Sequence, residues 1–267
     1  MSKYADGVVC ISRSVADEFG KWLNANATSR PRPLQIGWFH LGSDVKNSAP
    51  TYGLPEQAEE ALVSFAARPS FLMVGTIEPR KGHAQTLEAF ERLWQWGHEV
   101  NLIIVGKQGW MVERFIQRLR VHPELNKRLF WLEAISDEYL EKSYAACTCL
   151  IAASQGEGFG LPLVEAARHK LPILARDIPA FREVAGGHAS YFTGKEPGDL
   201  ANALKNWLAL RAENRHPKSD NMPWLTWAQS VEHLKGVLQD NWHLAWPADK
   251  RPICRDSPDT IEFTRDT

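Results

Sequence analysis

Short apolar runs alternate with amphipathic stretches along most of this chain. The runs lie at residues 71–75, 101–106, 128–132, 148–154 and 171–175, and their lengths are typical of buried strands. Between the first two, residues 83–97 carry apolar side chains at helical spacing, and similar stretches follow at 110–121 and 137–146. The pattern predicts an α/β fold, with a Rossmann-like parallel sheet and helices on both faces.

The two ends of the chain depart from this pattern. Residues 7–12 predict a strand and residues 14–23 a helix, and a Pro-rich stretch separates them from the main run of elements. One such βα unit is too small to fold alone. From Trp246 onward the sequence is polar and Pro-containing, without periodicity, so we assign it no function.

Composition narrows the class of protein. The chain has 267 residues, with 31 Lys and Arg against 32 Asp and Glu, so binding to nucleic acid is not its expected role. The four cysteines are scattered, which suits thiols in a reducing cytoplasm better than zinc ligands. We see neither a signal peptide nor an apolar span of transmembrane length, and we therefore expect a cytoplasmic protein.

A glycine-rich loop follows the run at 148–154. Ligands of doubly wound sheets bind beyond the carboxyl ends of the strands, where loops lead into helices. Here Gly156, Gly158 and Gly160 alternate, and a helix is expected to start near Pro162. Glycines let backbone approach a ligand, and a helix N-terminus attracts an anion. On its own, however, this spacing is a weak indication.

Two glutamates make the loop more informative. Glu157 lies in the glycine turn and Glu165 about one helical turn into the helix, with seven residues between them. Glu157 can face a sugar ring, and Glu165 can accept two hydrogen bonds from a ribose diol. The alternative is an ordinary helix N-terminal glutamate beside a solvated one.

A second candidate segment follows the strand at 71–75. Arg80 and Lys81 come after Gly75 and Thr76, so two cations lie where a diphosphate would bind in a doubly wound sheet. The alternative is an exposed basic turn without function. Fixed cations stabilise the charge that builds on a leaving group.

Other chemistries find little support. None of the nine histidines forms a metal-binding pair at helical spacing with an intervening glutamate, and no phosphate loop of the GxxxxGK[ST] type occurs. Most of the eleven tryptophans fall in apolar or helical positions that suit a core.

The segment EGFGLPLVEA resembles the Glu-x7-Glu motif of the group 1 family of retaining GT-B glycosyltransferases. The resemblance extends over about residues 71–240, through FLMVGTIEPRKGHAQTLEAF, ISDEYLEKSYAACTCLIAAS and PAFREVAGG. It implies the C-terminal, nucleotide-sugar-binding half of a GT-B fold. In two places the chain departs from the family, with Thr76 where many members have Arg and Lys170 where many have Gly.

The resemblance also implies roles for individual residues. The catalytic residues would be Glu157, Arg80 and Lys81, with no metal and no cofactor. The nucleotide sugar would lie against Gly75, Thr76, Arg80, Lys81, Leu132, Gly158, Phe159, Gly160, Leu161 and Glu165.

The domain organisation follows from the same resemblance. Residues 1–45 resemble the last βα unit of an N-terminal acceptor domain with the interdomain linker, and residues 46–245 the donor domain, whose helix at 224–240 crosses back. Residues 246–267 would be a polar tail. Because most of the acceptor domain would be missing, we expect the chain alone to be inactive.

The motifs are most similar to those of bacterial mannosyl- and rhamnosyltransferases of surface polysaccharide assembly. They imply that the donor is a nucleoside diphosphate sugar, with GDP-mannose as the first choice, and that the acceptor is a glycan or is lipid-linked. They also imply that the full-length enzyme associates peripherally with the inner face of the cytoplasmic membrane. Two alternatives stay open: a sugar-nucleotide epimerase of the same fold, and a catalytically silent nucleotide-binding module of a larger polymerase. The chain retains Glu157 and the basic pair, which disfavours the catalytically silent module.

Overall fold

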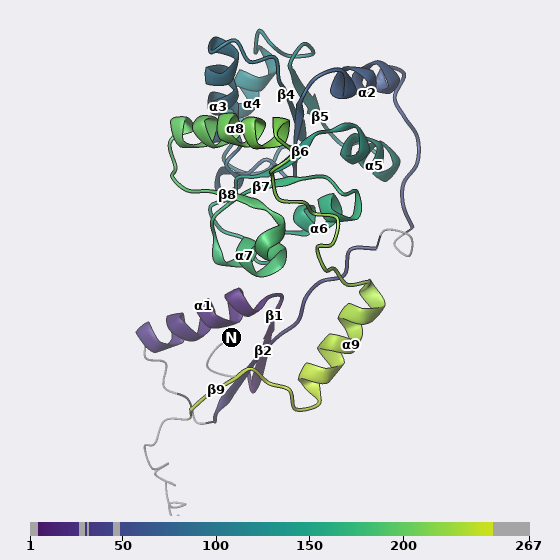
Figure 1. Cartoon of the computed structure of the whole chain (residues 1–267). Coiled ribbons are helices and arrows are strands. Elements are labelled where there is room, and N and C mark those ends of the chain that lie inside the picture. The colour runs from purple at the N-terminus through teal and green to yellow at the C-terminus, as the bar shows by residue number, and fades with distance from the viewer. Residues whose placement is uncertain (1–4, 27–29, 31, 45–48, 248–267) are drawn as a thin grey trace, which may run out of the picture.

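A main domain and a smaller unit make up the molecule (Figure 1). The computed structural model describes residues 5–26, 30, 32–44 and 49–247. We call residues 49–225 the main domain, and residues 5–44 together with 226–247 the small unit. The small unit lies below the main domain in the view of Figure 1, with α1 (Arg13–Ala25) beneath α7 (Pro179–Ala185).

The main domain is built on a six-stranded sheet in the order β5-β4-β3-β6-β7-β8, and each neighbouring pair is parallel. Its strands are β3 (Ser70–Val74), β4 (Asn101–Val105), β5 (Leu129–Leu132), β6 (Cys149–Ala152), β7 (Ile173–Arg176) and β8 (Ser190–Phe192).

Helices cover both faces of this sheet, which confirms the predicted fold class. One layer holds α3 (His83–Gln95), α4 (Glu113–Arg120) and α8 (Pro197–Ala212), and the other holds α2 (Ala58–Ala67), α5 (Asp137–Ala146), α6 (Leu161–Arg168) and α7. In β3, Phe71 and Met73 pack into the first layer and Leu72 into the second. A strand buried on both faces needs an unbroken apolar run, which is why alternation is absent there.

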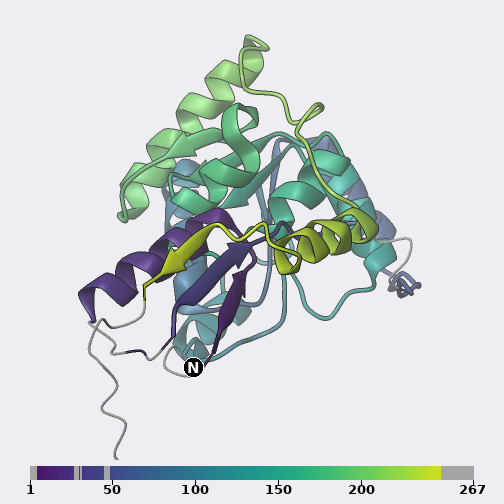
Figure 2. The ribbon, with the colours of Figure 1, turned by 90° about the horizontal axis from the view of Figure 1, so that it is seen from below.

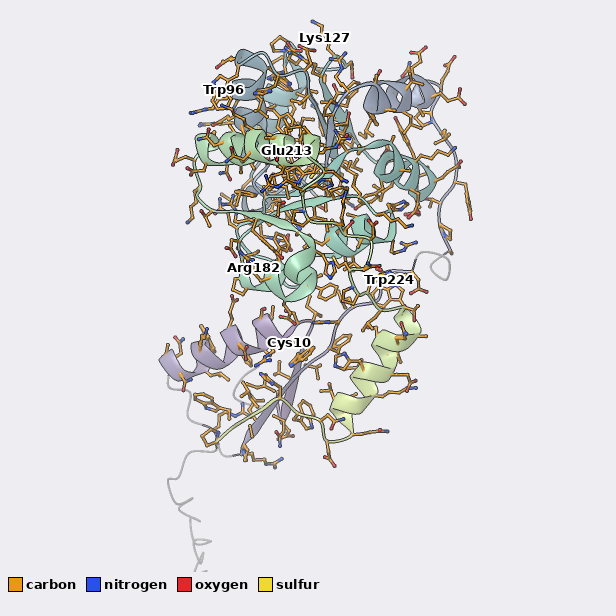
Figure 3. All side chains as sticks on the ribbon, in the orientation of Figure 1. Cys10, Trp96, Lys127, Arg182, Glu213 and Trp224 are labelled. Atoms are coloured by element: carbon orange, nitrogen blue, oxygen red, sulfur yellow. The ribbon has the colours of Figure 1, made fainter. Side chains whose placement is uncertain are left out.

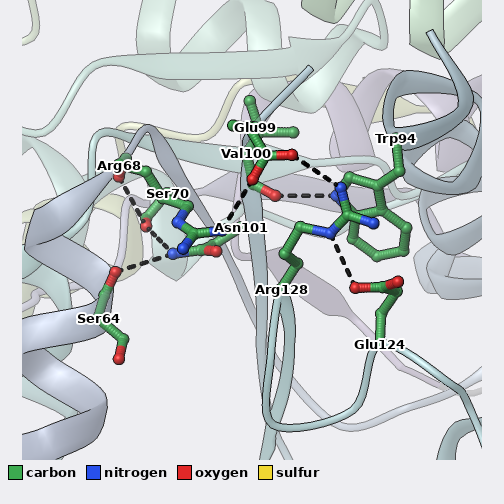
Figure 4. Close-up of polar contacts among 9 residues, drawn as sticks. All are labelled: Ser64, Arg68, Ser70, Trp94, Glu99, Val100, Asn101, Glu124 and Arg128. Carbon is green, nitrogen blue, oxygen red and sulfur yellow. Dashed lines mark hydrogen bonds and ion pairs between the residues drawn. The ribbon is translucent and has the colours of Figure 1, made fainter. Parts of the chain in front are cut away.

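Polar side chains close the amino end of the sheet (Figure 4). The Asn101 amide donates to the Ser64 carbonyl at 2.9 Å and to the Ser70 hydroxyl at 3.0 Å. Arg128 lies over the Trp94 ring, 5.3 Å from its centroid. At this end the named side chains bond to one another, whereas the carboxyl end carries the loops described below.

The order of the strands defines a switch point. The chain runs outward from β3 through β4 to β5, and then returns to place β6 on the other side of β3. The loops after β3 and β6 therefore leave two adjacent strands in opposite directions, which opens a crevice between them where ligands of such sheets bind.

The small unit has its own three-stranded sheet, seen from below in Figure 2. Its elements are β1 (Gly7–Cys10), α1, β2 (Leu34–Trp38), α9 (Trp227–Leu238) and β9 (Leu244–Trp246). β1 and β2 are parallel, and β9 pairs antiparallel with β2. Its buried apolar cluster is small: Cys10, Ala16, Leu23, Leu34 and Ile36.

The chain crosses between the two parts twice, at residues 39–44 and again at 222–226. The crossings lie side by side, because Gly42 and Leu225 form a β-bridge and the Ser43 amide donates to the Leu225 carbonyl at 3.0 Å. A Cβ at Gly42 would lie 2.4 Å from the Trp227 nitrogen, so only glycine fits this contact.

The end of the predicted donor domain, 46–245, is partly as expected. The helix predicted to cross back does so, because α9 packs on β2 of the small unit, but the strand β9, which pairs with β2, has no counterpart in the prediction. The helix expected at 224–240 begins only at Trp227, because the Thr226 hydroxyl caps it by accepting from the Gln229 amide. Trp246 ends β9 and does not begin a tail. Residues 248–267, like the boundary at 45/46, lie outside the described residues.

Other helices also differ from the sequence prediction. The helix expected at 110–121 starts at Glu113, since Met111 has a left-handed backbone with φ of 53°. The helices α2, α7 and α8 have no counterpart in the prediction.

Candidate active site

The glycine-rich loop joins β6 to α6 at the switch point. Gly160 has φ of 105° and is the N-cap residue of α6, and a Cβ there would lie 2.9 Å from the Phe181 ring. Only glycine meets both conditions. No side chain caps α6, whose first turn contains Pro162, so the positive end of its dipole is left for a ligand.

The basic turn after β3 packs directly against this loop. Pro79, Arg80 and Lys81 form one 3₁₀ turn, which ends at Gly82 with φ of 79°. The Gln155 amide donates to the Arg80 carbonyl at 2.8 Å. A Cβ at Gly82 would lie 2.5 Å from the Ala153 carbonyl oxygen. The two loops thus bring their side chains to one place.

Glu157 is at the centre of the polar contacts between them. Its carboxylate pairs with the Lys81 ammonium at 2.5 Å and the Arg80 guanidinium at 3.2 Å, and it accepts from the Ser154 hydroxyl at 2.7 Å. Burial raises the pKa of Glu157, but the hydrogen bonds from Lys81 and Ser154 and the two nearby cations outweigh it and hold this pKa below its ordinary value. The carboxylate is therefore ionised at neutral pH.

Arg80 is further fixed by Glu78 and by the glycine loop. Its Nε lies 3.1 Å from a Glu78 carboxylate oxygen, and its Nη1 donates to the Gly156 carbonyl at 3.0 Å. Both cations are therefore oriented before any ligand arrives, as electrostatic stabilisation of a developing charge requires.

Glu165 approaches the same place from α6. The Tyr144 hydroxyl donates to one of its carboxylate oxygens at 2.6 Å, and the Tyr144 ring stacks on His169. Burial raises the pKa of Glu165, and the Tyr144 hydrogen bond opposes this effect. One carboxylate oxygen is thus held by the protein, so the side chain has a fixed orientation.

A cleft of about 600 Å³ contains most of the residues predicted for the site. They are Gly75, Arg80, Lys81, Glu157, Gly158, Phe159, Gly160, Leu161 and Glu165. The Phe159 ring is buried and packs against His40, so it anchors the loop. Thr76 and Leu132 lie outside the cleft lining: Thr76 is next to Gly109, and Leu132 packs against the core.

Sequence reasoning missed several residues of this cleft, among them Val74 at the end of β3. Leu140 comes from α5, and Ile11 and Leu41 come from the small unit. The Ser12 hydroxyl donates to the Gly158 carbonyl at 2.6 Å, and a Cβ at Gly158 would lie 2.7 Å from the Ile11 side chain. No local pattern signals these contacts, which join residues 146 positions apart.

Two further observations concern the described part of the chain. It contains no group of three or more His, Cys, Asp or Glu side chains placed to hold a metal ion. None of its helices combines the length and the apolar character needed to span a bilayer.

Comparison with known proteins adds to this geometry. The family model described as "Glycosyl transferases group 1" matches residues 56–221, which include both loops of the cleft. The chain belongs to the group 1 glycosyltransferases. The resemblance carried by the EGFGLPLVEA segment is thereby confirmed.

Related group 1 sequences include bacterial mannosyltransferases. The serotype-specific mannosyltransferase WbdA of Escherichia coli is 55% identical over 236 residues, which cover 88% of this chain and 29% of the relative. The O-antigen chain mannosyltransferase RfbU of Salmonella typhimurium is 31% identical over 51% of this chain and 37% of its own length. This chain thus spans about a third of these relatives.

Solved structures of similar fold are more distant in sequence. The HepE protein of Anabaena, in complex with UDP and glucose, matches with a TM-score of 0.67 at 17% identity, over 88% of this chain and 63% of that protein. Sucrose-phosphate synthase of Thermosynechococcus elongatus gives the same TM-score at 20% identity, over 89% and 58%. At these sequence identities the structural similarity is evidence for the fold alone.

Proposed function

We propose that this chain is the donor-binding part of a retaining mannosyltransferase. It would take mannose from GDP-mannose and transfer it to a glycan or lipid-linked acceptor in bacterial surface polysaccharide synthesis. The observation that carries the proposal is the convergence of Arg80, Lys81, Glu157 and Glu165 in one cleft at the switch point of a group 1 sheet. The mannosyltransferase relatives favour the sugar.

Each side chain has a distinct role in this proposal. The diphosphate would lie against Arg80, Lys81 and the start of α6 at Gly160, where fixed cations stabilise the leaving group without a metal. Glu165 would hold the ribose and Glu157 the sugar hydroxyls. The base would lie near the loop after Leu132.

The remaining requirements concern parts outside this chain. We propose that a preceding acceptor domain, whose last part is residues 5–44 of the small unit, completes the cleft and aligns the acceptor hydroxyl. The whole enzyme would work in the cytoplasm, peripherally bound to the inner face of the membrane.

Titration calorimetry with GDP, UDP and dTDP, each with and without EDTA, tests the donor site. We expect weak binding, tightest for GDP and unaffected by EDTA, because the charge of the diphosphate is met by Arg80 and Lys81. If nucleotide binding strictly requires Mg²⁺, the metal-free mechanism is wrong. If UDP binds more tightly than GDP, the choice of GDP-mannose as donor is wrong.

Two variants separate the roles of the glutamates. Glu165→Ala should weaken GDP binding by one to two decades, since a lost hydrogen bond to a charged group costs about 1.5–3 kcal/mol. Glu157→Ala should spare GDP binding, because in this proposal Glu157 contacts the sugar hydroxyls, which GDP lacks. Glu88→Ala is the control, because Glu88 pairs with Arg118 and does not line the cleft. Equal losses for Glu157→Ala and Glu165→Ala would refute this assignment.

A further inference from the structure

Glu183 belongs to α7 of the main domain, but its hydrogen bonds come from the small unit. Its carboxylate accepts from the Arg13 amide at 2.8 Å, the Ser14 amide at 2.7 Å and the Ser14 hydroxyl at 2.5 Å. The His40 ring nitrogen Nε2, in the first crossing segment, lies 2.7 Å from the same carboxylate. Figure 3 labels the neighbouring Arg182, on the side of the main domain that faces α1.

These contacts cap α1 from outside its own unit. The Ser12 hydroxyl accepts from the Val15 amide at 3.3 Å, which is ordinary N-capping within the helix, and Glu183 takes the two preceding amides. A carboxylate at a helix N-terminus is also favoured by the helix dipole. The Glu183 side chain is only 15% exposed, so this interaction is weakly screened by solvent.

The titration of Glu183 agrees with this geometry. Burial raises its pKa, but the hydrogen bonds from His40, Ser14 and Arg13 outweigh burial and lower the pKa to about 2.

The capped turn leads directly into the donor cleft. Ile11 and Ser12 immediately precede it, and they are the residues that touch the glycine loop at Gly158. Gly158 follows Glu157, which holds the basic pair. Holding the N-terminus of α1 therefore also holds the small-unit wall of the cleft.

We propose that Glu183 is a positioning residue: by capping α1 from the main domain, it keeps Ile11 and Ser12 against the glycine loop and sets the closed shape of the donor cleft. Its effect on donor binding rests on the proposed function. The coupling between α7, α1 and the loop does not depend on which ligand the cleft binds.

Hydrogen exchange of the whole chain, followed by mass spectrometry, tests the coupling without any ligand. Glu183→Gln should raise exchange at residues 11–16 and at 155–163 by tenfold or more, and leave β4 unchanged. The second segment includes the Gln155 and Leu163 amides, which donate to the Arg80 and Gly160 carbonyls. Glu183→Asp, which keeps the charge, should give a smaller increase in both segments. Glu91→Gln is the matched control, because the Glu91 carboxylate also contacts a histidine ring, but its partners, His122 and Arg118, lie within the main domain.

The proposal is overturned if exchange rises at 11–16 while 155–163 keeps its wild-type rate. If Glu183→Gln loosens the whole main domain, the variant Ser14→Ala is used instead, because it removes one hydrogen-bond donor and keeps the carboxylate. A parallel increase of a few fold in the exchange rates of both segments supports the coupling. Unchanged exchange rates overturn it. GDP titration then gives the consequence, with up to tenfold weaker binding expected for Glu183→Gln. Absence of GDP binding by the wild-type chain would refute the proposed function and leave the exchange result intact.

Discussion

The main domain and the small unit differ in how much of their structure they stabilise themselves. The main domain places six strands between two helical layers, and Phe71 and Trp207 are fully buried in one of its two cores. The small unit buries one modest apolar cluster, and two amides at the start of its helix α1 donate to Glu183 of the main domain. One side of the donor cleft is therefore rigid by itself, and the other depends on contacts across the boundary.

The two sides of the cleft also differ chemically. The main domain contributes the charged groups Arg80, Lys81, Glu157 and Glu165. The small unit contributes the apolar side chains of Ile11 and Leu41. The main domain is suited to recognise a charged donor, and the small unit to exclude water from it.

The largest expected effect concerns sugar transfer. We expect this chain alone to transfer mannose about 1,000-fold more slowly than a polypeptide that also carries the preceding acceptor domain, because an open half-cleft cannot align an acceptor hydroxyl. Radiolabelled GDP-mannose with lipid-linked acceptors measures the two rates, and GDP affinity serves as the control for an intact donor site. Comparable rates would mean that the chain carries its own acceptor site.

Core substitutions should distinguish the stabilities of the two parts. Trp207→Ala should destabilise the main domain by about 3–5 kcal/mol, whereas Leu23→Ala should cost about 2–3 kcal/mol and loosen only the small unit. Urea unfolding combined with hydrogen exchange measures both. Trp22→Ala, which removes an exposed ring, is the control. Loss of protection in β3 and β4 on Leu23→Ala would show that the two parts unfold as one.

Acidification should weaken the junction between the parts. The hydrogen bonds from His40, Ser14 and Arg13 overcome the effect of burial and lower the pKa of Glu183 from its ordinary value of 4.5 to about 2. This stabilisation is present above about pH 4.5 and is lost as the pH falls towards 2, and it amounts to about 2–3 kcal/mol. In urea unfolding, the wild type should have a higher free energy of unfolding than Glu183→Gln at pH 7, and this difference should be smaller at pH 3.5. A difference independent of pH would contradict this assignment.

The smallest expected effect lies within the main domain. Lys170 is exposed and has φ of 55°, a backbone conformation that suits glycine, the residue many family members have there. Lys170→Gly should therefore raise the free energy of unfolding by about 1 kcal/mol, and Lys170→Ala should not. Thermal unfolding of the three proteins measures this difference, and equal Tm values would contradict it.

Local sequence was enough to predict the main-domain side of the site. The glycine loop and the basic turn each occupy a few consecutive residues, and their glycines and charges indicate chemistry without a partner. The ion pair between Lys81 and Glu157 could not be predicted, because it joins residues 76 positions apart. For the same reason, Ile11 was not identified as a residue of the cleft.

The small unit was harder to predict for a different reason. Its strand β9 has only three residues and pairs with β2, about 200 positions earlier in the chain. Such a short strand carries no periodicity of its own. Glu183 likewise entered the sequence analysis only within a family motif, since a cap donated from another domain leaves no local pattern.

The bridge between Gly42 and Leu225 has a mechanical consequence. Two backbone crossings that are hydrogen-bonded to each other act as a single pivot. Sliding the small unit along the main domain would break this pairing as well as the contacts of Ser12 and Glu183. Swinging about the pivot would break only the side-chain contacts. The motion of the small unit that breaks the fewest contacts is therefore a rotation about this pivot. In such a rotation β9 would move far while Gly42 stayed in place.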